Sequence, residues 1–529
     1  MKGKFVLKYV LPVLLIAAVT ASAAASGQSP GAAAPAGKKS FSILHTSYLQ
    51  APVPPDIDVN NNKWVDIIKR ENPDLDIFWI IIPPDQLNQR VNVMVGSGDM
   101  PDVLPMSMAQ MIQWSDMGII RNIDGLYQAN YKNIFNFLND DDLKTTRYKG
   151  HQYGIKVPDN RLQNPGVMMI RTDWLDKLKL SMPKTMDELY NVLRAFTFND
   201  PDGNGQKDTY GVAGCVQNGV SFSYMAPIFN AFDVNVAQGG NFSLVGNQII
   251  PDMIRPEMKN AIIYLEKLYR EGIMDKDTMT INPTQLEDKA VRGIAGMTGA
   301  PVNGFSVRIY PNMLKANPNA KIEMFVPPPA PNGKVFLTVG RNGGIMFGMS
   351  AKCKVPEAVL QYFNWTIEQD KSTLPFYTLN MDKIILGVLG EDSVPLGNKF
   401  YNNKAQNLLT PAQASELWRQ CYRFHGGTIQ ALPDDLIFES MRLRIAEGQS
   451  APFHLTAMQN VAKYGRPNAA AVTGPVYAQN INDIMTYWEE TISGIVTGTK
   501  PITAYDDFIR FFNANGGQKI IDEITALNK

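Results

Sequence analysis

The chain has 529 residues, of which 45% are hydrophobic and 19% are charged, and its formal net charge is zero. These proportions are those of a globular protein with enough residues for two or three domain-sized cores. An even charge balance argues against a nucleic-acid partner or an anionic membrane surface, and three cysteines are too few for a disulfide-built scaffold.

Residues 1–25 have the layout of a secretory signal peptide. Three lysines precede an apolar run from Tyr9 to Val19, and alanines and serines with A-x-A spacing follow. The run is short for a bilayer span, so we expect cleavage, with a retained membrane anchor as the alternative. Residues 26–39 are rich in Ala, Gly and Pro without periodicity, which predicts a flexible linker.

The cysteines are scattered and form no C-x-x-C motif. Cys215, Cys353 and Cys421 are far apart in the chain. We expect buried, unpaired thiols, and one disulfide formed in an oxidising compartment stays open as the alternative.

The first folded segment alternates between strand and helix patterns. Strands are expected at 41–45, 76–82 and 101–106, with helices at 61–72 and 84–100 between them. The continuous apolar run at 76–82 is typical of a parallel strand covered on both faces. This β-α-β-α-β order predicts a doubly wound sheet, in which ligands bind beyond the carboxyl ends of the strands. Ser107 follows the third strand and is therefore a candidate ligand-binding residue.

A second α/β unit follows. A strand at 166–171 precedes a helix at 184–196, which opens on Thr185 with Glu188 three residues later, as in a capping box. The apolar residues of this helix recur at i, i+3, i+4 and i+7 and predict one buried face. Further elements are expected as helices at 255–272, 356–369 and 505–527, and as strands at 293–300 and near 323–326.

The stretch "NDPDGNGQKDTYG" (199–211) concentrates oxygen ligands on a pliable backbone. Counted from Asp200, it matches the first nine positions of an EF-hand calcium loop, with Gly205 at the sharp bend. The candidate ligands are Asp200, Asp202, Asn204, Gln206 through its carbonyl group, and Asp208. Gly211 replaces the bidentate glutamate of position 12, so we expect a weak structural site rather than a sensor. A solvated turn without metal is the alternative.

Four longer stretches, taken together, resemble a known family. They are "VNVMVGSGDMPDVL" (91–104), the segment 167–211, "KVPEAVLQYFNWTIEQ" (354–369) and the segment 492–524. The chain resembles the carbohydrate-type extracellular solute-binding proteins of ABC importers, a group that includes alginate-oligosaccharide binders and large Gram-positive binding lipoproteins. The resemblance covers nearly all of the chain after the signal peptide.

The resemblance implies an α/β, two-lobed periplasmic-binding-protein-like fold with several interlobe crossings. The N-terminal lobe is expected at 40–157 and 275–327, and the C-terminal lobe at 158–274 and 328–529. The implied function is to bind an oligosaccharide by hinge closure and deliver it to membrane permease subunits, as a monomer without enzymatic activity. It also implies structural calcium in the aspartate-rich loop. Because "VTASAAASG" holds no lipid-attachment cysteine, we expect a periplasmic or secreted protein without a lipid anchor.

Sugar sites combine apolar ring faces with planar polar groups. On this basis, and on the family's geometry, the further candidate ligand-binding residues are Trp114, Asp159, Asn160, Arg161, Asn164, Asn303, Arg341, Asn342, Trp365 and Trp418. For each tryptophan core packing is the alternative, and for each polar residue a solvated loop. Trp64, Trp79 and Trp174 fall on predicted core faces and are assigned to packing.

An enzyme of another class is the competing hypothesis. The four histidines show no metal-binding spacing, and neither a G-x-S-x-G elbow nor a phosphate-binding loop is present. Asp140, Asp141 and Asp142 are acidic candidates for glycoside hydrolysis, although three consecutive residues are more typical of a solvated helix end. A secreted glycan hydrolase therefore stays open, as does a sensor subunit that presents ligand to a membrane kinase.

Overall fold

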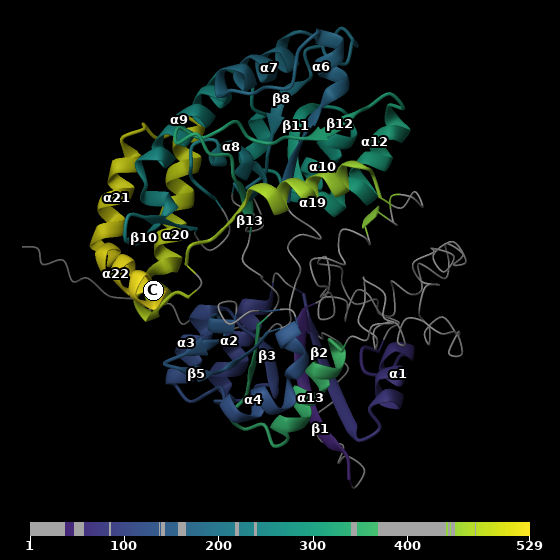
Figure 1. Ribbon diagram of the computed structural model, residues 1–529, viewed down its shortest axis with the longest axis vertical. Helices are drawn as coiled ribbons and strands as arrows, with labels where there is room; N and C mark the ends of the chain where they lie inside the picture. The colour runs from purple at the N-terminus through teal and green to yellow at the C-terminus, as the bar shows by residue number, and fades with distance from the viewer. Residues whose placement is uncertain are drawn as a thin grey trace, which may run out of the picture.

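The elements of the chain form two groups, drawn one above the other in Figure 1. The computed structural model describes residues 37–46, 58–83, 86–136, 138, 143–156, 166–216, 222–236, 241–339, 346–368, 441–442, 445, 450–470 and 472–528. Within these residues no helix is both long and apolar enough to cross a membrane. The expected signal peptide, most of the linker and the Asp140–Asp142 run lie outside the described residues.

The first group is built on a five-stranded sheet in the order β2-β1-β3-β14-β6. Its strands are β1 (Lys39–Thr46), β2 (Leu75–Ile82), β3 (Val103–Pro105), β6 (Gly154–Lys156) and β14 (Met346–Met349). β1 runs parallel to β2 and β3, whereas β14 is antiparallel to β3 and β6. The β-α-β-α-β unit is thus confirmed, with β1 at its centre.

The strand β2 differs from its expected environment. It lies at the edge of the sheet, where Trp79 is buried but its neighbour Phe78 is 38% exposed. Alternate residues of β2 are buried on one face, whereas Phe78 and Ile80 on the other face are less completely covered. The apolar run of 76–82 therefore does not mark a strand covered on both faces.

Helices and a short hairpin surround this sheet. They are α1 (Lys63–Glu71), α2 (Leu87–Ser97), α3 (Met108–Asp116), α4 (Asp124–Asn130), η3 (Lys132–Asn136), α13 (Pro356–Thr366), β4 (Arg147–Tyr148) and β5 (His151–Gln152). The second of these helices ends at Gly98, whose φ of 73° is the left-handed conformation that glycine adopts without strain.

The second group is built on a four-stranded sheet in the order β12-β7-β11-β8. Its strands are β7 (Gly166–Arg171), β8 (Tyr210–Ala213), β11 (Ala295–Pro301) and β12 (Ile322–Met324). β11 is parallel to β8 and antiparallel to β7. Two smaller pairs complete the strands: β9 (Phe242–Val245) with β10 (Gln248–Pro251), and β13 (Leu337–Val339) with β15 (Gly465–Pro467).

Helices cover this second sheet. They are α6 (Thr172–Leu178), α7 (Met186–Phe198), η4 (Ser223–Met225), α8 (Ala226–Asn230), η5 (Asp252–Ile254), α9 (Pro256–Arg270), η6 (Lys276–Met279), α10 (Pro283–Val291), α11 (Val302–Gly304), η7 (Phe305–Ile309), α12 (Tyr310–Ala316), α19 (Phe453–Tyr464), α20 (Pro475–Val496), α21 (Ala504–Ala514) and α22 (Gly517–Leu527). In α7 the Thr185 hydroxyl accepts the Glu188 N–H, as expected, but the Glu188 carboxylate accepts the N–H of Lys184 instead of Thr185.

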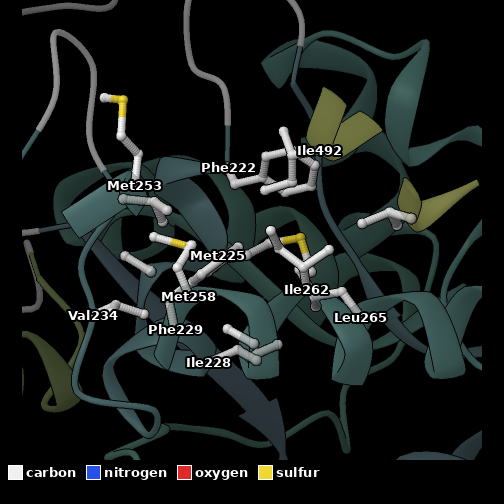
Figure 2. Close-up of a cluster of buried hydrophobic side chains, with 14 of the residues drawn as sticks. Phe222, Met225, Ile228, Phe229, Val234, Met253, Met258, Ile262, Leu265 and Ile492 are labelled. Carbon is white, nitrogen blue, oxygen red and sulfur yellow. The ribbon is translucent and has the colours of Figure 1, made fainter. Parts of the chain in front are cut away.

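The largest core lies in the second group, where distant segments meet. Figure 2 shows methionines from η4, η5 and α9 packed with phenylalanines and isoleucines, and Ile492 from α20 beside them. Each fully buried side chain of this kind stabilises the fold by about 1.5–3 kcal/mol. Trp174 and Trp79 are 1% and 3% exposed, so their assignment to packing is confirmed; nothing is described of the Trp64 side chain.

The strand pairings correct the expected lobe boundaries at two places. Segment 275–327 was expected in the N-terminal lobe, but its strands β11 and β12 pair with β7 of the second group. Segment 346–368 was expected in the C-terminal lobe, but β14 lies between β3 and β6 of the first group. The reason is packing: Phe347 of β14 is fully buried in the first core together with residues of α13.

The cysteines follow the expectation where they are described. Cys215 and Cys353 are buried and free. Cys421 lies outside the described residues.

Candidate ligand-binding site

Two connecting segments, called crossings here, run between the first and the second group of elements. Segment 157–165 joins Lys156, the last residue of β6, to Gly166, the first residue of β7. Segment 340–345 joins β13 to β14. A segment as long as the first spans at most about 35 Å. The first segment thus joins the end of β6 to the start of β7, and the second joins the β13–β15 pair to the start of β14. These strand ends frame the candidate site.

On the first sheet this edge holds the carboxyl end of β3. Met346 pairs with Lys156, and its carbonyl accepts the Met106 N–H at 2.8 Å. Ser107 follows and caps α3, where its hydroxyl accepts the Gln110 N–H and the Gln110 side chain accepts the Ser107 N–H. Ser107 is exposed at this edge, as expected for a residue beyond the third strand.

A buried lysine lies at the same edge. Lys156 is 6% exposed, and its Nζ donates to the Thr145 hydroxyl at 3.1 Å. Its carbonyl accepts the hydroxyl of Tyr131, which is completely buried. The crossing thus leaves the first group from a strand end that is fixed by buried hydrogen bonds.

On the second sheet the crossing reaches the end of β11, because Gly166 pairs with Pro301, the last residue of that strand. The chain then enters α11 and the π-helical turn η7, a helix type that is frequent at functional sites. Asn303 lies in this first turn and is partly buried. Its place at the strand end is as expected for a ligand-binding residue.

An ion pair lies over this turn. Arg308 donates to Glu287 of α10 through two bonds, one of them 2.7 Å long between Nε and Oε2. A Cβ atom at Gly304 would lie 3.2 Å from Nη2 of Arg308 and 3.8 Å from Oε1 of Glu287. The pair therefore lies directly against the turn that follows β11.

Two groups with raised pKa values share this neighbourhood. Burial, and after it the negative charge of Glu287, raise the pKa of Cys215 to about 12. Burial chiefly, with Cys215 and Glu287, raises the pKa of Tyr224 to about 12, and Arg308 acts in the opposite direction. Both groups are neutral at physiological pH, so the ion pair supplies the charges of this cluster.

The two aromatic candidates that the structure describes, Trp114 and Trp365, lie in or against hydrophobic clusters of the first group. Trp114 is 3% exposed and packs with residues of β1 and β3, so it is a core residue and not a ligand platform. Trp365 is partly buried against the core and stacks on Tyr362, with ring centroids 6.0 Å apart. The remaining candidates lie outside the described residues: Asp159, Asn160, Arg161, Asn164, Arg341, Asn342 and Trp418.

Glu287 and Arg308 are not among the residues expected from the sequence to lie near this turn. The available signal was the spacing: Arg308 follows Gly304 by four residues, and helical side chains point back toward the preceding turn. The partner Glu287 comes from another helix and has no local signal.

The aspartate-rich loop connects α7 to β8. Asp200 has a φ of 49°, and its carboxylate accepts the N–H groups of Gly203, Asn204 and Gly205. The Asn204 amide donates to Asp202 at 2.8 Å and to Asp208 at 3.1 Å. The carboxylates of the predicted ligands thus accept hydrogen bonds from the loop's own N–H groups and from the Asn204 amide.

Carboxylates this close affect each other's ionisation. Burial and a hydrogen bond with Asp200 raise the pKa of Asp202. Burial opposes ionisation of Asp200, but hydrogen bonds from Asp202 and the loop's N–H groups outweigh it and lower its pKa. In the part of the chain that the structure describes, no three His, Cys, Asp or Glu side chains are arranged to hold a metal. Asp200, Asp202 and Asp208 are thus not arranged together as metal ligands in this structure, although their hard oxygens are of the kind that calcium prefers.

The sequence and the fold are similar to those of known binding proteins. The profile of the bacterial extracellular solute-binding proteins matches residues 43–370. The chain belongs to this family. Its members are binding proteins, and the family is extracellular, as the sequence analysis expected.

Among curated family relatives, the polygalacturonan/rhamnogalacturonan-binding protein YtcQ of Bacillus subtilis is 29% identical over 394 residues, which cover 72% of this chain and 74% of that protein. The calcium-free alginate-binding protein AlgQ2 has a similar structure, with a TM-score of 0.65 and 18% identity over 93% of this chain and 98% of that one. The FusA binding protein of Streptococcus pneumoniae, solved with kestose, gives a TM-score of 0.61 and 18% identity over 92% and 98%. These likenesses confirm the two-lobed fold.

Proposed function

We propose that this family member binds an oligosaccharide between the two sheet edges and delivers it to an ABC importer in the membrane. The observation that carries the proposal is segment 157–165, which connects the strand end beside Ser107 to the strand end beside Asn303. Binding is a shift from an open to a closed arrangement of the lobes, driven by better ligand contacts in the closed form. The ligand leaves chemically unchanged.

Carbohydrate as the solute is supported by the relatives. YtcQ is named for polygalacturonan and rhamnogalacturonan, AlgQ2 for alginate, and FusA for fructooligosaccharide. We assign Ser107 and Asn303 to ligand contact on the two edges, together with the candidates of 157–164 and 341–342. Trp365 and Trp418 are proposed as ring platforms.

We also propose that the loop from Asp200 to Asp208 binds one structural calcium ion. The grouping of Asp202 and Asp208 around the Asn204 amide in one short loop supports this, and one similar structure is an EF-hand mutant of FusA. When bound, the ion supplies charge compensation to the carboxylates of Asp200, Asp202 and Asp208. Because the loop joins α7 to β8, fixing it fixes the register between a core helix and the second sheet.

We further propose that residues 1–25 direct export of the protein and that it acts as a soluble monomer outside the cytoplasmic membrane. Its macromolecular partner is the permease of the importer.

A melting screen tests the function. Purified protein is heated with each member of a glycan panel, while chromatography follows any product. We expect one oligosaccharide class to raise the melting temperature without product formation, and small-angle scattering to show a more compact particle with that ligand. Turnover of the glycan, or no shift with any member, overturns the proposal.

A further inference from the structure

The second crossing starts from a strand that has little pairing of its own. β13 has three residues and runs parallel to β15, and in the described part of the chain no third strand joins the pair. A parallel pair this short is marginal by itself. In Figure 1, β13 lies at the lower edge of the upper group, on the side of the first group. Other contacts must therefore hold β13 in place.

An asparagine takes the position of a second strand partner beside β13. The side-chain oxygen of Asn230 accepts the Thr338 N–H at 3.0 Å, and Nδ2 of Asn230 donates to the Thr338 hydroxyl at 2.8 Å. The Thr338 hydroxyl in turn donates to the side-chain oxygen of Asn235. Asn230 is 1% exposed, so these bonds are shielded from water. They join the middle residue of β13 to α8 and to the turn that follows it.

Charged groups hold β15, the other strand of the pair. Asp233 has a φ of 63°, and its carboxylate accepts from Arg466 of β15 at 2.6 Å and from Arg255 at 2.8 Å. The Asp233 carbonyl accepts from the same two guanidinium groups. Arg255 also donates to Asp252, whose other carboxylate oxygen accepts the Asn235 N–H. One aspartate thus joins two arginines that belong to different segments of the second lobe.

These contacts form one closed network. Thr338 and Arg466 are partners in the strand pair, so the bonds that leave β13 through the asparagines return to it through Asp233 and Arg466. The Arg466 guanidinium carbon also lies 3.3 Å from the centre of the Phe336 ring, just before β13. The side chain of Asp233 is 18% exposed, so its loss would leave poorly solvated arginine charges without a counter-ion.

The network determines how much free chain links the two lobes at this crossing. Segment 340–345 is shorter than segment 157–165, and the link from Val339 to Met346 spans at most about 25 Å. Its far end is fixed, because β14 pairs with both β3 and β6. If β13 separated from β15, the three residues of β13 would lengthen the link by about 10 Å. A longer link admits more arrangements of the lobes and lowers the fraction that can close on a ligand.

We propose that Asp233 and Arg466 are positioning residues, which restrict the arrangement of the two lobes by holding β13 and β15 together at the start of the second crossing. The inference goes beyond the proposed function, because it concerns the lobes and not the solute. It is tested without a ligand, so its failure and the failure of the proposed function are separate results.

Two variants break the network and a matched control does not. Asp233→Asn removes the charge and keeps a side chain that tolerates the left-handed φ. Arg466→Gln removes the charge at the more exposed end of the network, where the side chain is 34% exposed. Asp173→Asn is the control, because it also takes a carboxylate from a buried arginine of the second lobe, but at the corner between β7 and α6.

Hydrogen exchange followed by mass spectrometry reports on the strand pair. In Asp233→Asn and Arg466→Gln, the amides of 336–339 and 465–466 should exchange about tenfold faster than in wild type, because the pair opens more often. In Asp173→Asn the same amides should exchange at the wild-type rate.

Spin labels on the two lobes report on their arrangement. Asp66→Cys in α1 and Ala316→Cys in α12 place one label at an exposed position of each lobe. The background carries Cys421→Ser, and Cys215 and Cys353 are buried. Without ligand, the network variants should broaden the distribution of label-to-label distances by up to about 10 Å. The control should leave the distribution as in wild type.

Wild-type exchange in both network variants, or faster exchange with an unchanged distance distribution, overturns the inference. Equal broadening in Asp173→Asn overturns it too, since the effect would then follow from lost stability. If Asp233→Asn does not fold, Arg466→Gln decides. A wild type that binds no glycan overturns the proposed function and leaves this inference standing.

Discussion

Arg171 and Asp173 form a two-bonded ion pair at the corner where β7 turns into α6. The bonds are 2.8 Å between Nε and Oδ1 and 2.5 Å between Nη2 and Oδ2, and the guanidinium carbon lies 4.6 Å from the centre of the Trp174 ring. The side chains are 4% and 17% exposed. The pair therefore fixes a strand-to-helix corner inside the second core.

Asp173→Asn should destabilise the protein because it leaves the buried Arg171 charge without its counter-ion. We expect a loss of about 3 kcal/mol in the free energy of unfolding, measured by urea denaturation. Asp288→Asn is the control, since Asp288 and Arg292 are about 60% exposed, and should cost less than about 0.5 kcal/mol. Equal losses in both variants would show that burial of the corner pair has no special effect.

Calcium should stabilise the native protein through the aspartate-rich loop. At a free calcium concentration about 100 times Kd, the free energy of unfolding should rise by about 2.7 kcal/mol. Melting curves in EDTA and in calcium measure this rise, and Asp200→Asn should abolish it. Asparagine tolerates the left-handed φ of this position, so the variant tests the charge and not the backbone. A calcium response that survives in Asp200→Asn would contradict the assignment.

Calcium affinity should fall as the solution is acidified. The pKa of Asp202 is raised above 3.8, so its carboxylate takes up a proton earlier than an ordinary aspartate does. A protonated carboxyl is a poor ligand; hence calcium-dependent stability is present above the raised pKa and lost as the pH falls through it. Calcium titrations between about pH 7 and about pH 4 check this, and Asp202→Asn should flatten the profile. Constant wild-type affinity over that range would refute the prediction.

Gly299→Ala should distort the second sheet edge. A Cβ atom there would overlap the carbonyl oxygen of Tyr224, whose backbone packs directly on β11. We expect a loss of about 1–3 kcal/mol together with weaker glycan binding. Gly96→Ala in α2 meets no atom within 4 Å and should gain about 0.5–1 kcal/mol, because alanine is the better helix former. Urea unfolding of both variants is the measurement; a neutral Gly299→Ala would mean that the edge adapts.

Local patterns predicted individual elements well. In α7 the capping residue Thr185 and the apolar stripe are a few residues apart, so neighbours in sequence decide both the helix start and its buried face. The aspartate-rich loop is equally local, because the residues that hydrogen-bond within it belong to one short segment.

Long-range pairings were beyond such patterns. The local sequence around β14 does not indicate that Phe347 packs in the first core. This packing depends on β14 pairing with β3 on one side and β6 on the other. The same holds for Trp114, whose burial depends on strands that precede it, and for Glu287, which meets Arg308 across two helices. The family resemblance supplied the two-lobed fold but not the membership of each segment.

The late insertion of β14 also governs how this polypeptide can be made or divided. While a ribosome is still synthesising the second lobe, β3 and β6 of the first lobe lack β14, the strand that lies between them in the sheet. Neither lobe is a contiguous stretch of the chain, so a single cut after β6 that excises the first lobe removes β14 from between β3 and β6. The first lobe therefore completes its sheet only after most of the second lobe has been synthesised.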